Sequence, residues 1–235
     1  MINAGMPEVV LLAHTNHPML PAKAAKFCTS VAPVEKIMEP ADNDEQLLGR
    51  VLSAGHESVI EHFSATFGVS GISRVTETQF VRHRIASFSV KSGRYTAVGE
   101  RYEVVIPPSI LHHQNPMVPA LYKELMSNAQ NAYRYLMDAG IKQEDARYLL
   151  PQATATQLMV TMNARELLHF FSKRVCGRAQ WEINFVAKKM LVLCKELSPV
   201  IFKTAGPDCL KSGVCREDKK SSCGLRPHYS EVANG

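Results

Sequence analysis

The sequence predicts an α+β fold, with mixed helices around a central β-sheet in a single domain. Three observations predict it. Strand-like alternation of apolar residues and the three- and four-residue spacing of amphipathic helices both occur along the chain. These segments do not follow the regular strand–helix–strand order of a parallel α/β sheet. A chain of 235 residues, 46% of them hydrophobic and 21% charged, is also long enough to bury a sizeable core.

The first half of the chain is predicted to contain strands separated by short helices. A continuous apolar run indicates a buried strand, and a loose alternation indicates a second one. Ser73 can cap a helix that would present Gln79 and Arg82 on one face, because they are three residues apart. In chain order, the predicted elements are a strand over 8–13, a helix over 46–52 that ends at Gly55, a strand over 62–72, a helix from Ser73 through Arg82, and β-rich segments over 95–98 and 102–106.

The second half is predicted to be mostly helical. Leucine and alanine recur at helical spacing over 116–139, and Gly140 should end that helix. Asn163 and Glu166 have the spacing of a capping box, which begins a helix by satisfying two free backbone N–H groups. The remaining predicted elements are a strand over 157–162, a helix from 163 to about 173, and a helix from 180 to about 197.

Composition and charge narrow the class of protein. No stretch approaches the roughly 18 apolar residues of a membrane span, and no secretory signal is visible, so we expect a cytoplasmic protein that binds no membrane. The formal net charge of +5 suggests a phosphate-bearing ligand or a nucleic acid. Six cysteines are too few for a disulfide scaffold of this length, and we expect reduced thiols.

Residues 82–95 are the most informative segment of the chain. They include four cations, one histidine and three serines within fourteen positions. Arginine is preferred where a phosphate or a planar carbonyl is held by two parallel hydrogen bonds. Ser92 and Gly93 also allow a tight turn whose backbone N–H groups can hold an anion. The alternative interpretation is a solvated basic face.

The pattern extends well beyond this segment. Arg82-His83-Arg84 is followed, after seven residues, by Ser92. This spacing resembles the signature of the flavin-dependent thymidylate synthases, and ordered matches run from about residue 8 to residue 203. The further matching segments are 55–62, 146–151, 163–165, Arg174 and 179–183.

The resemblance implies a function and an assembly. Members of this family make dTMP from dUMP, with methylenetetrahydrofolate as the carbon donor and with FAD that NADPH reduces. They form homotetramers whose active sites lie between subunits. The resemblance thus implies small-molecule partners and no nucleic acid. It implies a catalytic domain over 1–205, followed by a tail over 206–235 that is rich in Cys, Gly and Lys.

The resemblance also implies roles for individual residues. We expect Arg174 to be catalytic, since a fixed guanidinium against the uracil ring can stabilise its anionic form. Ser92 is expected to bind substrate, because no neighbouring base is evident that would activate it as a nucleophile. The expected FAD contacts are Ser58, Arg82, His83, Arg84, Asn163, Arg165 and His169. The expected dUMP contacts are Gln79, Arg82, Ser92, Gly93, Arg94, Arg147 and Arg174.

Several residues depart from the family pattern or carry alternative interpretations. Val90, Lys173 and Arg178 differ from the usual residues, so a nucleotide-binding relative with altered chemistry is one alternative. A basic nucleic-acid-binding protein is another, and it predicts salt-sensitive binding without flavin.

Three cysteines near the C-terminus are candidate metal ligands. Cys209, Cys215 and Cys223 lack the short spacing of a zinc knuckle, although His228 could be a fourth ligand. Cys176 has no local motif that would make it a nucleophile. We therefore expect no metal site and a flexible, thiol-bearing tail.

Overall fold

The computed structural model describes residues 2–3, 5–96 and 102–232. The chain divides into two compact units, each built from several segments. Unit 1 comprises Met1–Glu8, Gly68–Arg82 and Phe88–Met159, and unit 2 comprises Val9–Phe67, His83–Ser87 and Val160–Gly235. Residues 206–235 thus belong to unit 2, and the predicted domain boundary at 205 stays a prediction.

A four-stranded antiparallel sheet has the order β2-β3-β6-β4. Buried and more exposed side chains alternate along the central strand β6, as expected for a strand with one face in the core. Its buried side chains are Thr156, Leu158, Val160 and Met162. The strands are β2 (Glu8–His14), β3 (Ser64–Ser73), β4 (Ala86–Val90) and β6 (Ala155–Asn163). Together with the helices they confirm the predicted α+β class.

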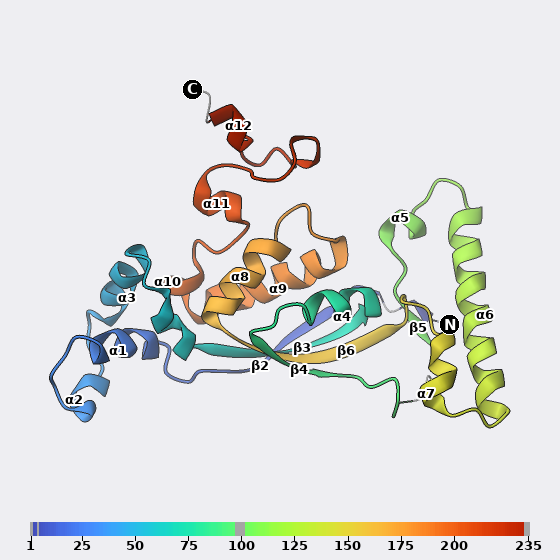
Figure 1. Ribbon diagram of the computed structural model, residues 1–235, viewed down its shortest axis with the longest axis horizontal. Coiled ribbons are helices and arrows are strands. Elements are labelled where there is room, and N and C mark those ends of the chain that lie inside the picture. The colour runs from blue at the N-terminus through green and yellow to red at the C-terminus, as the bar shows by residue number, and fades with distance from the viewer. Residues whose placement is uncertain (1, 4, 97–101, 233–235) are drawn as a thin grey trace. The chain divides into compact units, whose positions relative to one another are not determined.

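Unit 1 is built around a long helix and a small aromatic and aliphatic core (Figure 1). Tyr102, Val104 and Ile106 are buried against apolar residues of α5 and α6. The two-residue strand β1 pairs in parallel with β5. The elements are β1 (Ile2–Asn3), α4 (Arg74–Phe80), β5 (Glu103–Val104), α5 (Pro108–Leu111), α6 (Met117–Asp138), α7 (Gln143–Ala146) and the 3-10 turn η2 (Arg147–Leu149).

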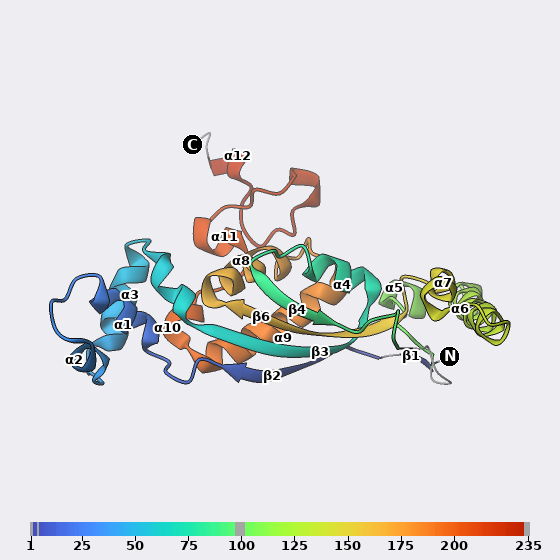
Figure 2. The ribbon, with the colours of Figure 1, turned by 60° about the horizontal axis from the view of Figure 1, so that its bottom comes forward.

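Unit 2 is mostly helical, and its core is aromatic. Phe202 meets Phe63 and Phe171 edge to face, with ring centroids 6.0 and 6.2 Å apart. Helix α8 packs against α9 and η1 (Figure 2). The elements are α1 (Leu20–Phe27), α2 (Val34–Met38), α3 (Asp44–Ser53), η1 (Glu57–His62), α8 (Ala164–Arg174), α9 (Trp181–Leu197), α10 (Pro199–Phe202), α11 (Asp208–Ser212), η3 (Lys219–Ser221) and α12 (Tyr229–Val232).

The five predicted helices all form, as α3, α4, α6, α8 and α9, whereas shorter helices such as α1, α2 and α7 were not predicted. Helices α3 and α6 end just before Gly55 and Gly140, which have φ values of +83° and +83° that favour glycine. The side chains of Ser73, Asn163 and Gln180 cap α4, α8 and α9. Among the described residues, no helix is long and apolar enough to cross a membrane.

The structure corrects four expectations. Strand β2 forms but is not buried, because it lies at the sheet edge, where Val10 and Leu12 are 45% and 50% exposed. Strand β4 was not predicted, because its residues fall within the basic segment. Helix α4 ends at Phe80, so Arg82 lies beyond it. Residues 95–96 form a turn and a bend rather than a strand, and residues 97–98 lie outside the described part of the chain.

A buried ion pair holds α3 against α1 in unit 2. The fully buried Lys23 ammonium contacts Asp44, and Lys26 contacts the other carboxylate oxygen at 2.6 Å. Burial alone would raise the pKa of Asp44, but hydrogen bonds from Lys23 and Lys26 lower it below its ordinary value. The Asp44 carboxylate therefore provides the counter-charge for the Lys23 ammonium, which has no access to water.

We expect Asp44→Asn to lower the free energy of unfolding by about 3–5 kcal/mol, because it leaves a buried ammonium without its counter-ion. Urea unfolding measures this loss. Glu45→Gln is the matched control on the exposed neighbour, with a change below about 0.5 kcal/mol. Because the folded pKa of Asp44 is lowered, its contribution should be present above about pH 4 and lost as the pH falls further. Equal effects of both substitutions would contradict this account.

Candidate active site

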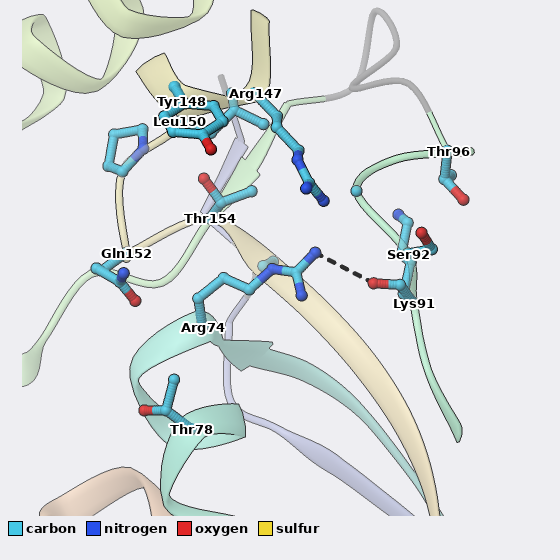
Figure 3. Close-up of a pocket in the computed structure, with 13 residues that line it drawn as sticks. Arg74, Thr78, Lys91, Ser92, Thr96, Arg147, Tyr148, Leu150, Gln152 and Thr154 are labelled. Carbon is cyan, nitrogen blue, oxygen red and sulfur yellow. Dashed lines mark hydrogen bonds between the residues drawn. The ribbon is translucent and has the colours of Figure 1, made fainter. Parts of the chain in front are cut away.

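Unit 1 contains a cavity of about 350 Å³ at the turn that follows β4 (Figure 3). Three residues that the resemblance assigns to the substrate line it, namely Ser92, Gly93 and Arg147. Arg74 and Thr78 of α4 face the same space, and the segment that leads into β6 closes another side. The cavity thus joins residues from three separate parts of the sequence and presents two guanidinium groups.

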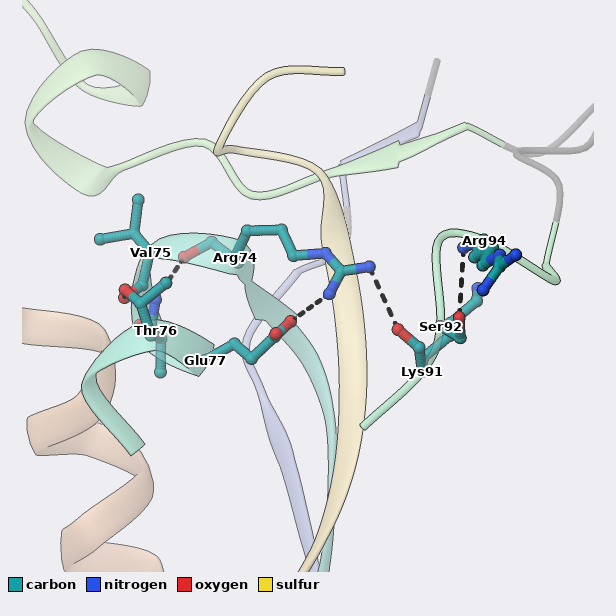
Figure 4. A network of polar contacts seen from close by, with 9 residues as sticks. Arg74, Val75, Thr76, Glu77, Lys91, Ser92 and Arg94 are labelled. Atoms are coloured by element: carbon teal, nitrogen blue, oxygen red, sulfur yellow. Dashed lines mark hydrogen bonds and ion pairs between the residues drawn. The ribbon is translucent and has the colours of Figure 1, made fainter. Parts of the chain in front are cut away.

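Arg74 is held in place by two partners (Figure 4). Its Nη1 atom contacts the Glu77 carboxylate at 2.6 Å, and its Nη2 atom donates to the Lys91 carbonyl at 3.1 Å. The residue begins α4 directly after Ser73, whose hydroxyl accepts a hydrogen bond from the Thr76 N–H. Arg74 was not predicted from the sequence, because it lies outside residues 82–95 and belongs to no recognised motif.

Gly93 allows the turn to approach both arginines closely. A Cβ atom at this position would lie 3.3 Å from Arg74 Nη2 and 3.6 Å from Arg147 Cδ. The turn is further fixed because Gln143 Nε2 donates to the Gly93 carbonyl at 3.2 Å. Arg147 Nε donates to the Glu144 carbonyl at 3.0 Å. Two oriented guanidinium groups beside a turn are suited to an anion such as phosphate.

The other predicted substrate residues of unit 1 are not among the described lining residues of this cavity. Arg94 forms an ion pair with Glu144 at 2.6 Å, and its guanidinium lies over the Tyr95 ring. Gln79 is half-buried in α4, and Arg82 is exposed just after that helix. Their substrate contacts stay predictions.

Unit 2 contains a chain of three polar side chains, of which His83 and Glu166 are buried and Arg174 is half-buried. The His83 Nδ1 atom lies 3.1 Å from Glu166 Oε1, and Arg174 Nε donates to His83 Nε2 at 3.1 Å. Because Nε2 accepts this bond, the ring proton must sit on Nδ1 and be donated to the carboxylate. His83 and Glu166 are each about 6% exposed. The arrangement fixes the plane of the Arg174 guanidinium.

Burial and neighbouring charges together set the pKa of His83. Burial lowers its pKa, the hydrogen bond to Glu166 works against this, and the positive charge of Arg174 lowers the pKa further. The net effect is a pKa below the ordinary value, which keeps the ring neutral and able to accept from Arg174. The resemblance assigns His83 to the flavin, and in the structure both ring nitrogens are already engaged.

Glu166 was recognised in the sequence only as a capping residue. The cap forms in part, because Asn163 Oδ1 accepts from the Glu166 N–H at 2.9 Å. The Glu166 carboxylate turns instead to His83, and it also lies 3.5 Å from His169 Nδ1. Among the described residues, only these three side chains bring three potential metal ligands within 4.8 Å of one another. The Arg174 donor on His83 disfavours a cation there.

A second cavity of about 1130 Å³ lies within unit 2. Three predicted flavin residues line it, namely Asn163, Arg165 and His169. Arg165 forms an ion pair with Glu61 at 2.6 Å, and both side chains are about half exposed. Ser58 and Arg84 are exposed residues of the same unit and are not among its described lining residues.

Comparison with known proteins shows the family of this chain. The family model for thymidylate synthase complementing protein matches residues 10–200. The flavin-dependent thymidylate synthase of Geobacter sulfurreducens is 44% identical over 214 residues, which cover 89% of this chain and 91% of that protein. The chain belongs to the flavin-dependent thymidylate synthase family. The family member from Nitratidesulfovibrio vulgaris is 40% identical over 239 residues and covers 94% of this chain and 96% of its own.

A solved structure extends the comparison to the fold. The UMP/dUMP methylase PolB from Streptomyces cacaoi, in a crystal structure with bound 5-Br dUMP, aligns with a TM-score of 0.75. Its sequence is 27% identical, and the alignment covers 86% of this chain and 96% of that one. Family membership and the α+β fold inferred from the sequence are thereby confirmed, whereas the roles of single residues stay predictions.

We expect Glu166→Gln to lower the pKa of His83 further, because the carboxylate is the group that raises it. A nuclear magnetic resonance titration of the His83 ring measures this shift directly. Glu196→Gln, an exposed change on α9, is the control and should leave the titration unchanged. A rise in the His83 pKa in the Glu166 variant would show that the carboxylate does not act as described.

Proposed function

We propose that this chain methylates dUMP reductively to give dTMP. In this proposal methylenetetrahydrofolate is the carbon donor, FAD is the hydride carrier, and NADPH supplies the electrons. The observation that carries the proposal is the cavity of unit 1, where Ser92, Gly93 and Arg147 meet a further guanidinium from Arg74. Membership of the family and the likeness to a methylase that binds 5-Br dUMP support it.

The cavity of unit 1 suits the phosphate end of a nucleotide. Its volume of about 350 Å³ falls at the lower end of ligand pockets, which span roughly 300–1,000 Å³. Arg74 and Arg147 can pair with phosphate oxygens, and the Ser92 hydroxyl can donate to a third. We also assign Gln79, Arg82 and Arg94 to dUMP, as the family pattern implies.

The cavity of unit 2 suits FAD in size and in its donors. Its volume of about 1130 Å³ is at the upper end for a ligand pocket. Asn163 offers an amide, and Arg165 and His169 offer charged or polar N–H groups for the pyrophosphate and the ring. The proposed contacts also include Ser58, Arg82, His83 and Arg84. FAD, when bound, supplies the hydride chemistry that amino-acid side chains lack.

Arg174 is the proposed catalytic residue. The uracil ring must become electron-rich at C5 before it can accept a carbon unit. A guanidinium against N3 and O4 stabilises the developing negative charge and does not lose its own proton. His83 acts as a positioning residue, because its neutral ring holds Arg174 Nε and so limits how the guanidinium can turn. The order of carbon and hydride transfer is left open in this proposal.

The assembly and location belong to the same proposal. We propose a homotetramer with active sites shared between subunits, located in the cytoplasm, with neither nucleic acid nor membrane as a partner. Sedimentation of the FAD-loaded protein at assay concentration tests the assembly. A fully active monomer would contradict it.

We expect Arg174→Ala to reduce dTMP formation by at least about 100-fold, as the loss of a group that stabilises transition-state charge does. Bound FAD should be retained, as absorbance of the purified protein will show. The exposed Arg50→Ala is the control for loss of one arginine and should leave turnover unchanged. Turnover near the wild-type level in Arg174→Ala would remove the assigned role.

The same assay, with and without NADPH and added FAD, tests the reaction itself. Product that requires both supports the proposal. Folded, FAD-loaded protein without product favours a relative with altered chemistry. Absence of flavin uptake together with salt-sensitive binding of DNA or RNA would favour the nucleic-acid alternative.

We expect Arg147→Ala to weaken dUMP binding by roughly 10- to 100-fold, which corresponds to about 1.5–3 kcal/mol for a hydrogen bond to a charged group. Calorimetry with dUMP and with deoxyuridine separates phosphate binding from base binding. Only dUMP should lose affinity. Lys142→Ala, an exposed cation of the same segment, is the matched control. Equal losses for both ligands would contradict a phosphate contact.

A further inference from the structure

Four cysteine thiols that have no assigned contact with substrate or flavin lie in unit 2. Cys176 lies in the loop between α8 and α9, two residues after Arg174. Cys209 belongs to α11, and Cys215 and Cys223 follow in the C-terminal segment. All four are free thiols, of which Cys215 is buried and Cys223 is exposed. The sequence separates them into two groups that the fold brings together.

Contacts between the C-terminal segment and the α8–α9 region hold these two parts of the chain close together. Lys173 of α8 pairs with Asp208 of α11 at 2.6 Å, and Figures 1 and 2 both show α11 beside α8. Arg178 lies 3.7 Å from Glu217. A Cβ atom placed on Gly177 would lie 3.5 Å from the Cys223 sulfur, which puts that thiol against the residue that follows Cys176.

Cys209 joins the same region through its own helix. It follows Asp208, whose carboxylate pairs at 2.6 Å with Lys173, three residues before Cys176. The Ser222 hydroxyl contacts the Cys215 sulfur at 3.6 Å, which orients that sulfur within the segment.

His228 does not complete this group. The backbones of Cys215 and His228 are joined in an isolated bridge, so the ring is close. However, His228 Nδ1 contacts the Ser230 hydroxyl at 2.7 Å, and Nε2 contacts the Glu217 carbonyl at 3.0 Å. Both ring nitrogens therefore stabilise the C-terminal segment. The tail itself contains three thiols, and Cys176 is the candidate for the fourth member of the group.

We propose that Cys176, Cys209, Cys215 and Cys223 form a four-cysteine site for a structural zinc ion. Structural zinc is bound by four ligands in a closed tetrahedron, and four thiolates are one of its common ligand sets. Binding releases the thiol protons, and the two charges of Zn²⁺ leave a complex of net charge −2.

Zinc binding requires the four sulfurs to move closer together. Bond lengths of about 2.3 Å put the sulfurs of a zinc tetrahedron roughly 3.8 Å apart. The thiols are more widely spaced, since no three of them come within 4.8 Å of one another among the described residues. Gly213 and Gly224 flank the Cys215–Cys223 stretch with φ values of +76° and +75°. Turns of this kind and the exposed Cys223 side chain allow the sulfurs to close on an ion.

The site has a structural consequence for the proposed catalytic loop. Asn184 Nδ2 donates to the carbonyls of Arg174 and Cys176, at 2.9 Å in both cases. One amide thus joins the arginine to the first zinc ligand. A bound ion would connect the C-terminal segment to this loop and reduce the movement of the backbone that carries Arg174.

The test uses the full chain, reduced, stripped of metal and then incubated with zinc chloride. After dialysis, elemental analysis should find about one zinc ion per chain. Alkylation followed by peptide mass spectrometry should show that zinc protects all four thiols, while the exposed Cys28 reacts equally with and without zinc. Zinc well below one per chain, or unchanged alkylation of the four thiols, would overturn the proposal.

Variants separate the ligands from their neighbours. Cys176→Ser and Cys223→Ser should each lower zinc affinity by at least about tenfold, and Cys28→Ser should not change it. His228→Gln should retain zinc, which keeps the test decisive if Cys215→Ser fails to fold. A disulfide among the four cysteines in freshly purified protein, iron with inorganic sulfide in place of zinc, or zinc loss in His228→Gln would each contradict the proposed ligand set. None of these readouts depends on dTMP formation.

Discussion

The neutrality of a single buried histidine controls the geometry of the proposed catalytic arginine. His83 can accept from Arg174 only while Nε2 carries no proton, and burial maintains that state. Glu166 receives the proton on the other nitrogen and thereby selects the tautomer. Phe170 packs edge-on against the ring with centroids 4.9 Å apart, so the apolar core of unit 2 also contributes. The packing of the core around His83 therefore also determines the protonation state on which the orientation of Arg174 depends.

The cavity of unit 1, which we assign to the nucleotide, depends on a different principle, namely the close approach of the backbone to charged side chains. A glycine in the turn after β4 leaves room for two guanidinium groups, and each arginine is held by acceptors of its own. Such groups are oriented before a ligand arrives, so binding does not have to order them.

Sequence patterns predicted the features that depend on local rules. Glycine positions predicted the ends of α3 and α6, and cap residues predicted the starts of α4 and α8. The family resemblance, rather than a local rule, assigned Ser92, Gly93 and Arg147 to one ligand, and the three residues line one cavity. Features that depend on tertiary contact were missed. Arg74 gains its place from Lys91, and Glu166 gains its role from a histidine 83 residues away. An alternating strand likewise does not reveal whether it will lie at the centre or edge of a sheet.

The edge position of β2 affects how this protein behaves in solution. In the described part of the chain no further strand pairs with its outer side, and Val10 and Leu12 add about half-exposed apolar side chains. An open, apolar sheet edge is a template on which a strand of another molecule can add. A chain purified alone at high concentration is therefore prone to self-association through this edge. A lysine at either of the two positions would protect it, as charged residues do on natural edge strands.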